Sequence, residues 1–78
     1  MKYKSRAISL TYIKQGDSSI ISKIFTEEKG LQTFIIKNIR SKKSKKKLSH
    51  FEPLTLLNID ADFNNKNSLQ YLGEVSIG

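Results

Sequence analysis

The sequence contains no cysteine, no tryptophan, one proline and one histidine. Without cysteine the chain can form neither disulfides nor thiolate metal sites, and small secreted domains normally depend on such crosslinks. A single histidine excludes a multi-histidine metal cage and the usual partner network of a histidine-based catalytic triad. We therefore expect an intracellular domain that has no metal ion and no cofactor.

Long apolar runs are also missing, and nothing approaches the ~20 consecutive apolar residues that a membrane-spanning helix needs. The basic start of the chain is followed by apolar residues that alternate with Ser9 and Thr11, which is unlike a signal peptide. A chain of 78 residues has room for one domain with a thin core and no deep catalytic pocket. The only histidine, His50, is expected in a loop. The sequence thus predicts no membrane segment and no enzymatic activity.

Apolar and polar residues alternate with a period of two, and β-branched types are frequent, which predicts strands rather than helices. Gly30 is placed where a bulged hairpin turn requires the left-handed conformation. Several of the segments have apolar residues on both faces, and an open sheet would leave too much isoleucine exposed. Five strands are expected, over residues 3–13, 19–26, 31–39, 54–63 and 68–77.

An all-β chain of this size closes most simply into a five-stranded Greek-key barrel of the OB-fold type. The longest break falls between the third and fourth strands, where we expect a basic loop or a short helical turn around Lys45–His50. Ser49 and Glu52 have the spacing of a helix capping box, but Pro53 disfavours helical geometry at the residue before it.

Positive charge is concentrated in one segment. The net charge is +7, and residues 37–47 contain seven lysines and arginines and no acidic residue. A dense cationic segment on an otherwise neutral chain indicates a place where a polyanion such as DNA is held through its phosphates. The alternative is that the segment is an ordinary solvated basic loop. The candidate DNA-binding residues are Lys37, Arg40, Lys42, Lys43, Lys45, Lys46 and Lys47.

Within this segment, Lys37 and Arg40 lie at or beside the end of a predicted strand, so we expect the barrel to hold them. The lysines from 45 to 47 belong to the loop and would have to be ordered on binding, which costs affinity. Aromatic residues at strand spacing are usually core, but four are candidates for base stacking: Tyr3, Tyr12, Phe34 and Tyr71.

Four short motifs follow one another along the chain. They are Gly16-Asp17-Ser18, Phe25-Thr26-Glu27-Glu28-Lys29-Gly30-Leu31, Lys37-x-x-Arg40-Ser41-Lys42-Lys43-Ser44 and Phe51-x-Pro53-Leu54. In this order they resemble the amino-terminal domain of the RecO family of bacterial DNA repair proteins. Asn38 stands where the family usually has glycine, and because asparagine tolerates positive φ we expect the same backbone path.

The resemblance implies an OB-fold domain that binds single- and double-stranded DNA in a cytoplasmic, nucleoid-associated recombination mediator. Such a mediator anneals strands and, with RecR, helps load the RecA recombinase onto strands covered by single-strand-binding protein. Residues 1–78 would be a single domain of a longer protein, whose helical carboxy-terminal domain, with its zinc-binding cysteines and its docking site for single-strand-binding protein, lies outside this sequence. DNA contact is carried over to Lys37, Arg40, Lys42 and Lys43, and to the three later lysines on charge alone. The alternative is a docking module for RecR whose lysines only tune solubility or encounter.

Overall fold

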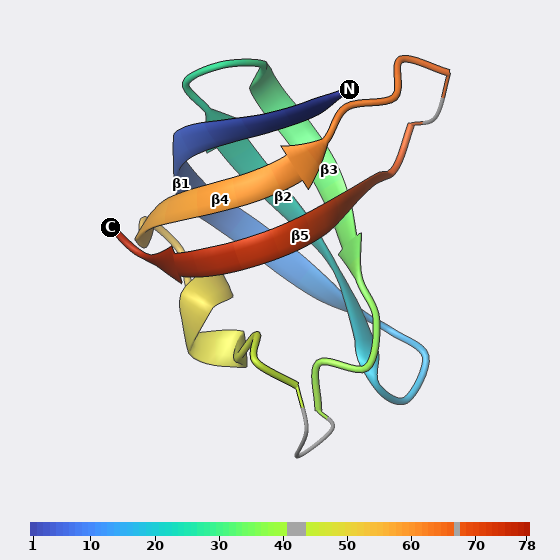
Figure 1. Ribbon diagram of the computed structural model, residues 1–78. Helices are drawn as coiled ribbons and strands as arrows, with labels where there is room; N and C mark the ends of the chain where they lie inside the picture. The colour runs from blue at the N-terminus through green and yellow to red at the C-terminus, as the bar shows by residue number, and fades with distance from the viewer. Residues whose placement is uncertain (41–43, 67) are drawn as a thin grey trace.

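Within the described residues 1–40, 44–66 and 68–78, the computed structural model contains five strands and one short 3-10 helix (Figure 1). The elements are β1 (Lys2–Gln15), β2 (Ser19–Thr26), β3 (Gly30–Ile36), the 3-10 helix η1 (Leu48–Phe51), β4 (Leu56–Asp62) and β5 (Gln70–Ile77). The strands form a closed barrel in the order β1-β2-β3-β5-β4, in which β3 and β5 are parallel and the other neighbours antiparallel. The predicted all-β OB-fold barrel is confirmed.

Two strand ends differ from the predicted ones because the backbone nearby has a positive φ, and β5 begins two residues later than predicted, at Gln70. β2 has the predicted bounds, but β3 ends at Ile36 because Asn38 has a φ of 57°, which extended strand geometry does not allow. β4 begins at Leu56 and not at Leu54, whose φ is 64°. The left-handed conformation expected at Gly30 is present, with a φ of 70°.

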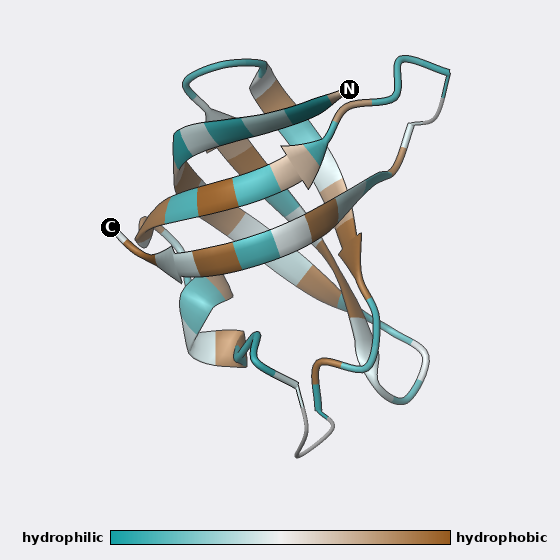
Figure 2. Ribbon diagram, in the orientation of Figure 1, coloured by the Kyte–Doolittle hydropathy of each residue, from teal (hydrophilic) through white to brown (hydrophobic). Residues whose placement is uncertain are grey.

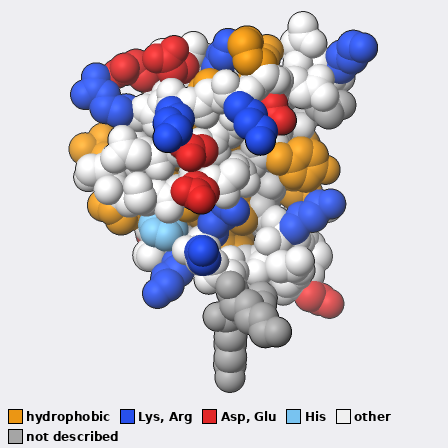
Figure 3. All heavy atoms as spheres, in the orientation of Figure 1, with side chains coloured by type: hydrophobic (Ala, Val, Ile, Leu, Met, Phe, Trp, Pro, Cys, Tyr) orange, Lys and Arg blue, Asp and Glu red, His pale blue; other side chains and the backbone are white. Residues whose placement is uncertain are grey.

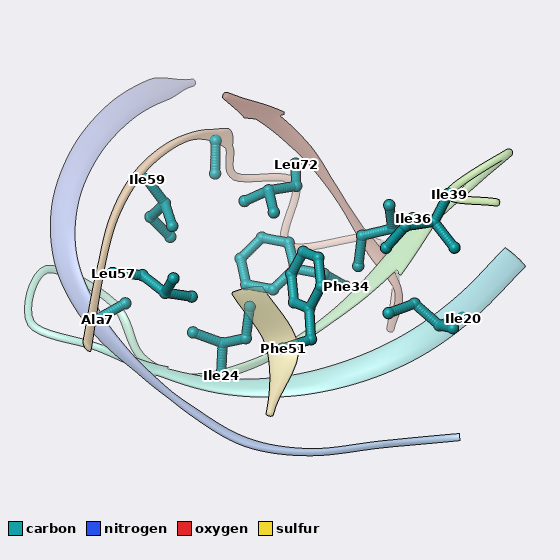
Figure 4. Close-up of a cluster of buried hydrophobic side chains, with 11 residues drawn as sticks. Ala7, Ile20, Ile24, Phe34, Ile36, Ile39, Phe51, Leu57, Ile59 and Leu72 are labelled. Carbon is teal, nitrogen blue, oxygen red and sulfur yellow. The ribbon is translucent and has the colours of Figure 1, made fainter. Parts of the chain in front are cut away.

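The barrel interior is filled from every strand and from η1. Apolar and polar residues alternate along the strands, as the colouring of Figure 2 shows. Phe34 of β3 and Phe51 of η1 are both fully buried and lie next to each other at the centre of the core (Figure 4). Burial of each ring contributes about 1.5–3 kcal/mol. The core residues are Ala7, Ile20, Ile24, Phe34, Ile36, Ile39, Phe51, Leu57, Ile59, Ala61 and Leu72.

Ser9, which lies at a register shift in the pairing of β1 with β2, holds η1 and the chain after it on the barrel. The buried Ser9 hydroxyl donates to the carbonyl of Phe51 at 2.9 Å, and the Ser9 N–H donates to the carbonyl of Thr55 at 2.9 Å. The Leu54 N–H in turn donates to the Ser9 carbonyl at 2.6 Å. These bonds fix the end of η1 and the residues that follow it on the barrel.

Candidate nucleic-acid interface

A groove of about 650 Å³ lies where the two ends of the basic segment meet β5. The turn after β3 forms one side, and the residues that lead into η1 form the other. The groove is lined by Lys37, Asn38, Ser44, Lys45, Lys46, Gly73, Glu74 and Val75. It thus brings together side chains that are distant in sequence on a floor made by β5.

The turn after β3 holds Lys37 at the groove. Ile39 is buried in the core, and its N–H donates to the carbonyl of Ser18 at 2.8 Å. The Ser18 hydroxyl donates to the side-chain oxygen of Asn38 at 3.4 Å. The positive φ of Asn38 confirms the backbone conformation expected for an asparagine in the place of the family's glycine. Lys37 is therefore an exposed side chain on an anchored backbone, as expected.

The other side of the groove leads into η1, a short helix at Leu48–Phe51 close to the helical turn that the sequence analysis gave as one of two expectations around Lys45–His50. The Ser44 hydroxyl donates to the Lys46 carbonyl at 3.0 Å, and the Lys46 N–H donates to the Ser44 oxygen at 3.2 Å. The Lys47 N–H donates to Nδ1 of His50 at 3.1 Å, which caps the start of η1. His50 thus has a local structural role, and the fully buried Phe51 anchors the segment that contains Lys45 and Lys46.

The groove has a net positive charge. Among the residues that line it, three are lysines and one, Glu74, is acidic. Two ion pairs form within the described part of the chain, Met1 with Asp62 and Arg6 with Glu27, and neither involves a groove lysine. Lys37 instead places its Nζ 5.6 Å from the ring centroid of Tyr71. The groove ammonium groups are available to an anion.

The remaining candidate cations lie elsewhere. Arg40 and Lys47 are exposed but do not line the groove, and Lys42 and Lys43 lie outside the described residues. On the face shown in Figure 3, basic side chains are spread over the surface with acidic ones between them. What distinguishes Lys37, Lys45 and Lys46 is their convergence on one groove.

Burial separates the four aromatic residues named as candidates for base stacking. Phe34 is fully buried, so it is a core residue and cannot stack on a base. Tyr3 and Tyr12 are half-buried and pack against the core. Burial also raises the pKa of the Tyr3 phenol. Tyr71 is 55% exposed and lies beside Lys37.

An apolar row on the outer wall of the barrel was not recognised from the sequence. Ile8 of β1 is the register partner of both Phe25 and Leu56, and Phe25 is the partner of Leu31. The side chains of Phe25, Leu31 and Leu56 are each more than half exposed. The sequence contains the signal, since apolar residues occur on both faces of these strands. Closure buries the inner face only.

The described part of the chain holds no group of three or more metal-ligating side chains and no helix long and apolar enough to cross a membrane. Its fold and surface define a small OB-fold domain with a basic groove against β5. The chain belongs to the recombination protein O family, because the model for the amino-terminal part of that family matches residues 1–77. The resemblance seen in the sequence motifs is thereby confirmed.

Proteins named DNA repair protein RecO are similar to this chain along nearly all of its length. The relative from Flavobacterium psychrophilum is 40% identical over 78 residues, which cover 99% of this chain and 33% of the relative. The one from Flavobacterium johnsoniae is 33% identical over 76 residues, covering 96% and 32%. The one from Christiangramia forsetii is 33% identical over 78 residues, covering 99% and 33%. The chain therefore spans about a third of the length of these curated relatives.

Proposed function

We propose that this domain is a noncatalytic DNA-binding module of a recombination mediator in DNA repair, and that it binds single and double strands independently of sequence. The convergence of Lys37, Lys45 and Lys46 on one groove, without ion-pair partners among the described residues, is the observation that supports it. A lysine ammonium is a point charge without the fork geometry that reads base edges, so the expected contacts are to phosphates.

The proposed site consists of the groove lysines with Arg40 and Lys47 beside them. Lys42 and Lys43 are included on charge and on the family resemblance alone. We further propose that residues 1–78 act as a single domain of a longer cytoplasmic, nucleoid-associated protein, since the named relatives are about three times as long. In that protein the domain would contribute to strand annealing and, with RecR and single-strand-binding protein, to recombinase loading.

Titration of the purified domain into labelled single- and double-stranded oligonucleotides at several salt concentrations tests the proposal. Each phosphate neutralised on a single strand contributes about 0.7 to the slope of log K against log salt. The three groove lysines alone would give a slope of about −2, and all seven candidate cations a slope of about −5. Undetectable binding at low salt would reject DNA binding by this domain, and a slope near zero would reject its electrostatic basis.

The apolar row favours a second candidate function, a docking module for a protein partner. The exposed side chains of Phe25 and Leu31 are register partners on β2 and β3, and Ile8 of β1 links Phe25 to the exposed Leu56 of β4. Such apolar rows mark protein interaction sites. The partner implied by the family resemblance is RecR.

Replacement of Phe25 and Leu31 by serine tests this second candidate. The variant should lose RecR binding in a pull-down and keep its DNA affinity. Ile13→Ser, which alters an equally exposed apolar side chain outside the row, is the control. Unchanged RecR binding by the Phe25 and Leu31 variant would exclude the row as the docking surface.

A further inference from the structure

Tyr71 is an exposed aromatic side chain on a rigid backbone. It lies in β5 between two strands, with Ile35 of β3 as its register partner on one side and Asp62 of β4 on the other. Its neighbours Gln70 and Leu72 are buried, whereas Tyr71 is 55% exposed. Because side chains alternate along a strand, the inward direction of these two neighbours directs Tyr71 outward. The ring is therefore presented to solvent from a fixed position on the barrel wall.

The ring lies beside the basic groove, next to one of the lysines that line it. Nζ of Lys37, a groove residue, lies 5.6 Å from the Tyr71 centroid. Gly73 lines the groove two residues further along β5, and as a glycine it has no side chain there. A Cβ at Gly73 would lie only 3.0 Å from the carbonyl oxygen of Asp60, so a side chain is not accommodated at this position without movement. The path from the groove lysines to the ring is thus unobstructed by a side chain at residue 73.

Positive charge is concentrated on one side of Tyr71. The three groove lysines lie there, whereas the hollow of about 550 Å³ on the other side of the ring is lined by charges of both signs, Lys2 and Lys4 together with Asp60, Asp62 and Glu74. Asp62 is also paired with the amino terminus at 2.7 Å. A phosphodiester chain is therefore attracted more strongly to the groove side. A strand whose phosphates contact the lysines would run along the groove side, with its bases able to turn toward the ring.

We propose that Tyr71 is a stacking platform for one unpaired base, an inference that rests on the proposed DNA-binding function. Lys37, which has a flexible four-carbon stem, would leave the ring for a phosphate when the strand binds. An exposed cation–π contact is weak compared with base stacking, so the exchange is favourable. Bases in a duplex are already stacked and paired, so this platform gives single strands an additional contact and the domain a preference for them.

The experiment compares Tyr71→Ala, Tyr71→Leu and Tyr71→Phe with the wild-type domain on three labelled substrates. These are a single-stranded oligonucleotide, the same oligonucleotide with abasic sites, and a duplex of equal length. Phe25→Ala is the matched control, because Phe25 is 53% exposed but lies in the apolar row away from the groove. Circular dichroism and thermal melting verify that each variant is folded.

Stacking of one base on an aromatic side chain corresponds to a loss of affinity of about fivefold or more on truncation. Tyr71→Ala and Tyr71→Leu should show this loss on the intact single strand, should bind the duplex within about twofold of wild type, and should keep the salt slope. Tyr71→Phe and Phe25→Ala should bind as wild type does. The wild-type domain should bind the abasic strand about as weakly as Tyr71→Ala binds the intact one.

Two failures are distinguishable. If the wild-type domain binds no DNA at low salt, the proposed function itself is lost. If it binds with a steep salt dependence but does not discriminate against abasic sites, or if Tyr71→Ala binds single strands as tightly as wild type, stacking on Tyr71 is rejected and DNA binding stands. Equal losses on single strand and duplex would also reject it. The abasic comparison uses the wild-type chain, so the inference remains testable even where a variant does not fold.

Discussion

Neutralising two of the groove lysines tests whether the groove, rather than the whole basic segment, binds DNA. The perturbed residues are Lys37 and Lys45, one from each side of the groove, each replaced by glutamine. The matched variant replaces Arg40 and Lys47, which are exposed in the same segment but do not line the groove. Both double variants change the net charge from +7 to +5, so any difference between them reports position and not overall charge.

The size of the effect follows from counterion release. Each phosphate contact on a single strand adds about 0.7 to the salt slope, which at ~0.1 M salt corresponds to about a fivefold gain in affinity over 1 M salt. Loss of two contacts should therefore reduce the slope by about 1.4 and weaken binding at ~0.1 M salt by about 25-fold. The matched variant removes two cations that lie beside the groove but do not line it, so we expect it to reduce the slope by less and to weaken binding by less.

Fluorescence anisotropy of a labelled single strand, titrated at several salt concentrations, measures both quantities. Circular dichroism must show an intact barrel in both variants for the comparison to be valid. Equal losses of affinity in the two variants would mean that all the cations of the segment contribute alike through their charge and that the groove has no special role. A greater loss in the Arg40 and Lys47 variant would show that the anchoring residues have been misassigned.

Three further predictions concern the free energy of unfolding. Ser9→Ala should lower it by about 1–3 kcal/mol, because the buried carbonyl of Phe51 loses its hydrogen-bond donor. Leu54→Gly should raise it by up to about 1 kcal/mol, because Leu54 has a φ of 64° and its side chain is 76% exposed. Tyr3→Phe should change it by less than about 1 kcal/mol, because the buried Tyr3 hydroxyl lies beside only the Thr26 hydroxyl, which already bonds the Gly30 carbonyl and the Lys29 N–H. Burial raises the pKa of Tyr3 above 10.0, so the unfolded chain loses the phenol proton at a lower pH than the folded chain does. The free energy of unfolding should therefore fall as the pH rises from about 10 through the raised pKa. Tyr3→Phe should reduce that fall.

Denaturant titration followed by circular dichroism measures all three, with a matched control for two of them. Ser76→Ala removes an exposed hydroxyl on β5 and should be close to neutral, so an equally small effect at Ser9 would contradict the role of its hydrogen bond. Leu54→Ala shortens the side chain but keeps a Cβ at positive φ, so it should not reproduce the gain of Leu54→Gly. A clear loss of stability in Tyr3→Phe would mean that the hydroxyl makes a favourable interaction.

The strands were predictable because alternation with a period of two is a local property, and the turn at Gly30 because glycine tolerates positive φ without steric cost. The start of β4 was not, since a leucine gives no such signal at Leu54. Its conformation comes from a tight turn in which the Thr55 N–H donates to the Glu52 carbonyl at 3.3 Å and Pro53 precedes the residue with positive φ. This is the arrangement of a type II turn, so Pro53 was the available signal.

Charge density located the basic segment, but the set of lysines that converge could not be read from local sequence. Lys37 lies near Tyr71 because β3 and β5 pair in parallel, which is a long-range contact. Lys45 and Lys46 reach the same groove because Phe51 is buried in the core and Ser9 holds its carbonyl. Both causes act between residues far apart in the chain, and neither leaves a pattern within the segment itself.

The basic segment is bounded by buried residues, and this explains how like charges can be held together. Ile39 lies in the core near its start and Phe51 shortly after its end, so burial of two large apolar side chains anchors both flanks. Repulsion between exposed ammonium groups is only about 1 kcal/mol at 4 Å in water and is reduced further by salt, whereas each buried side chain contributes about 1.5–3 kcal/mol. The core can therefore impose a concentration of positive charge that the segment alone would not adopt. A polyanion bound in the groove, as proposed, would relieve that cost.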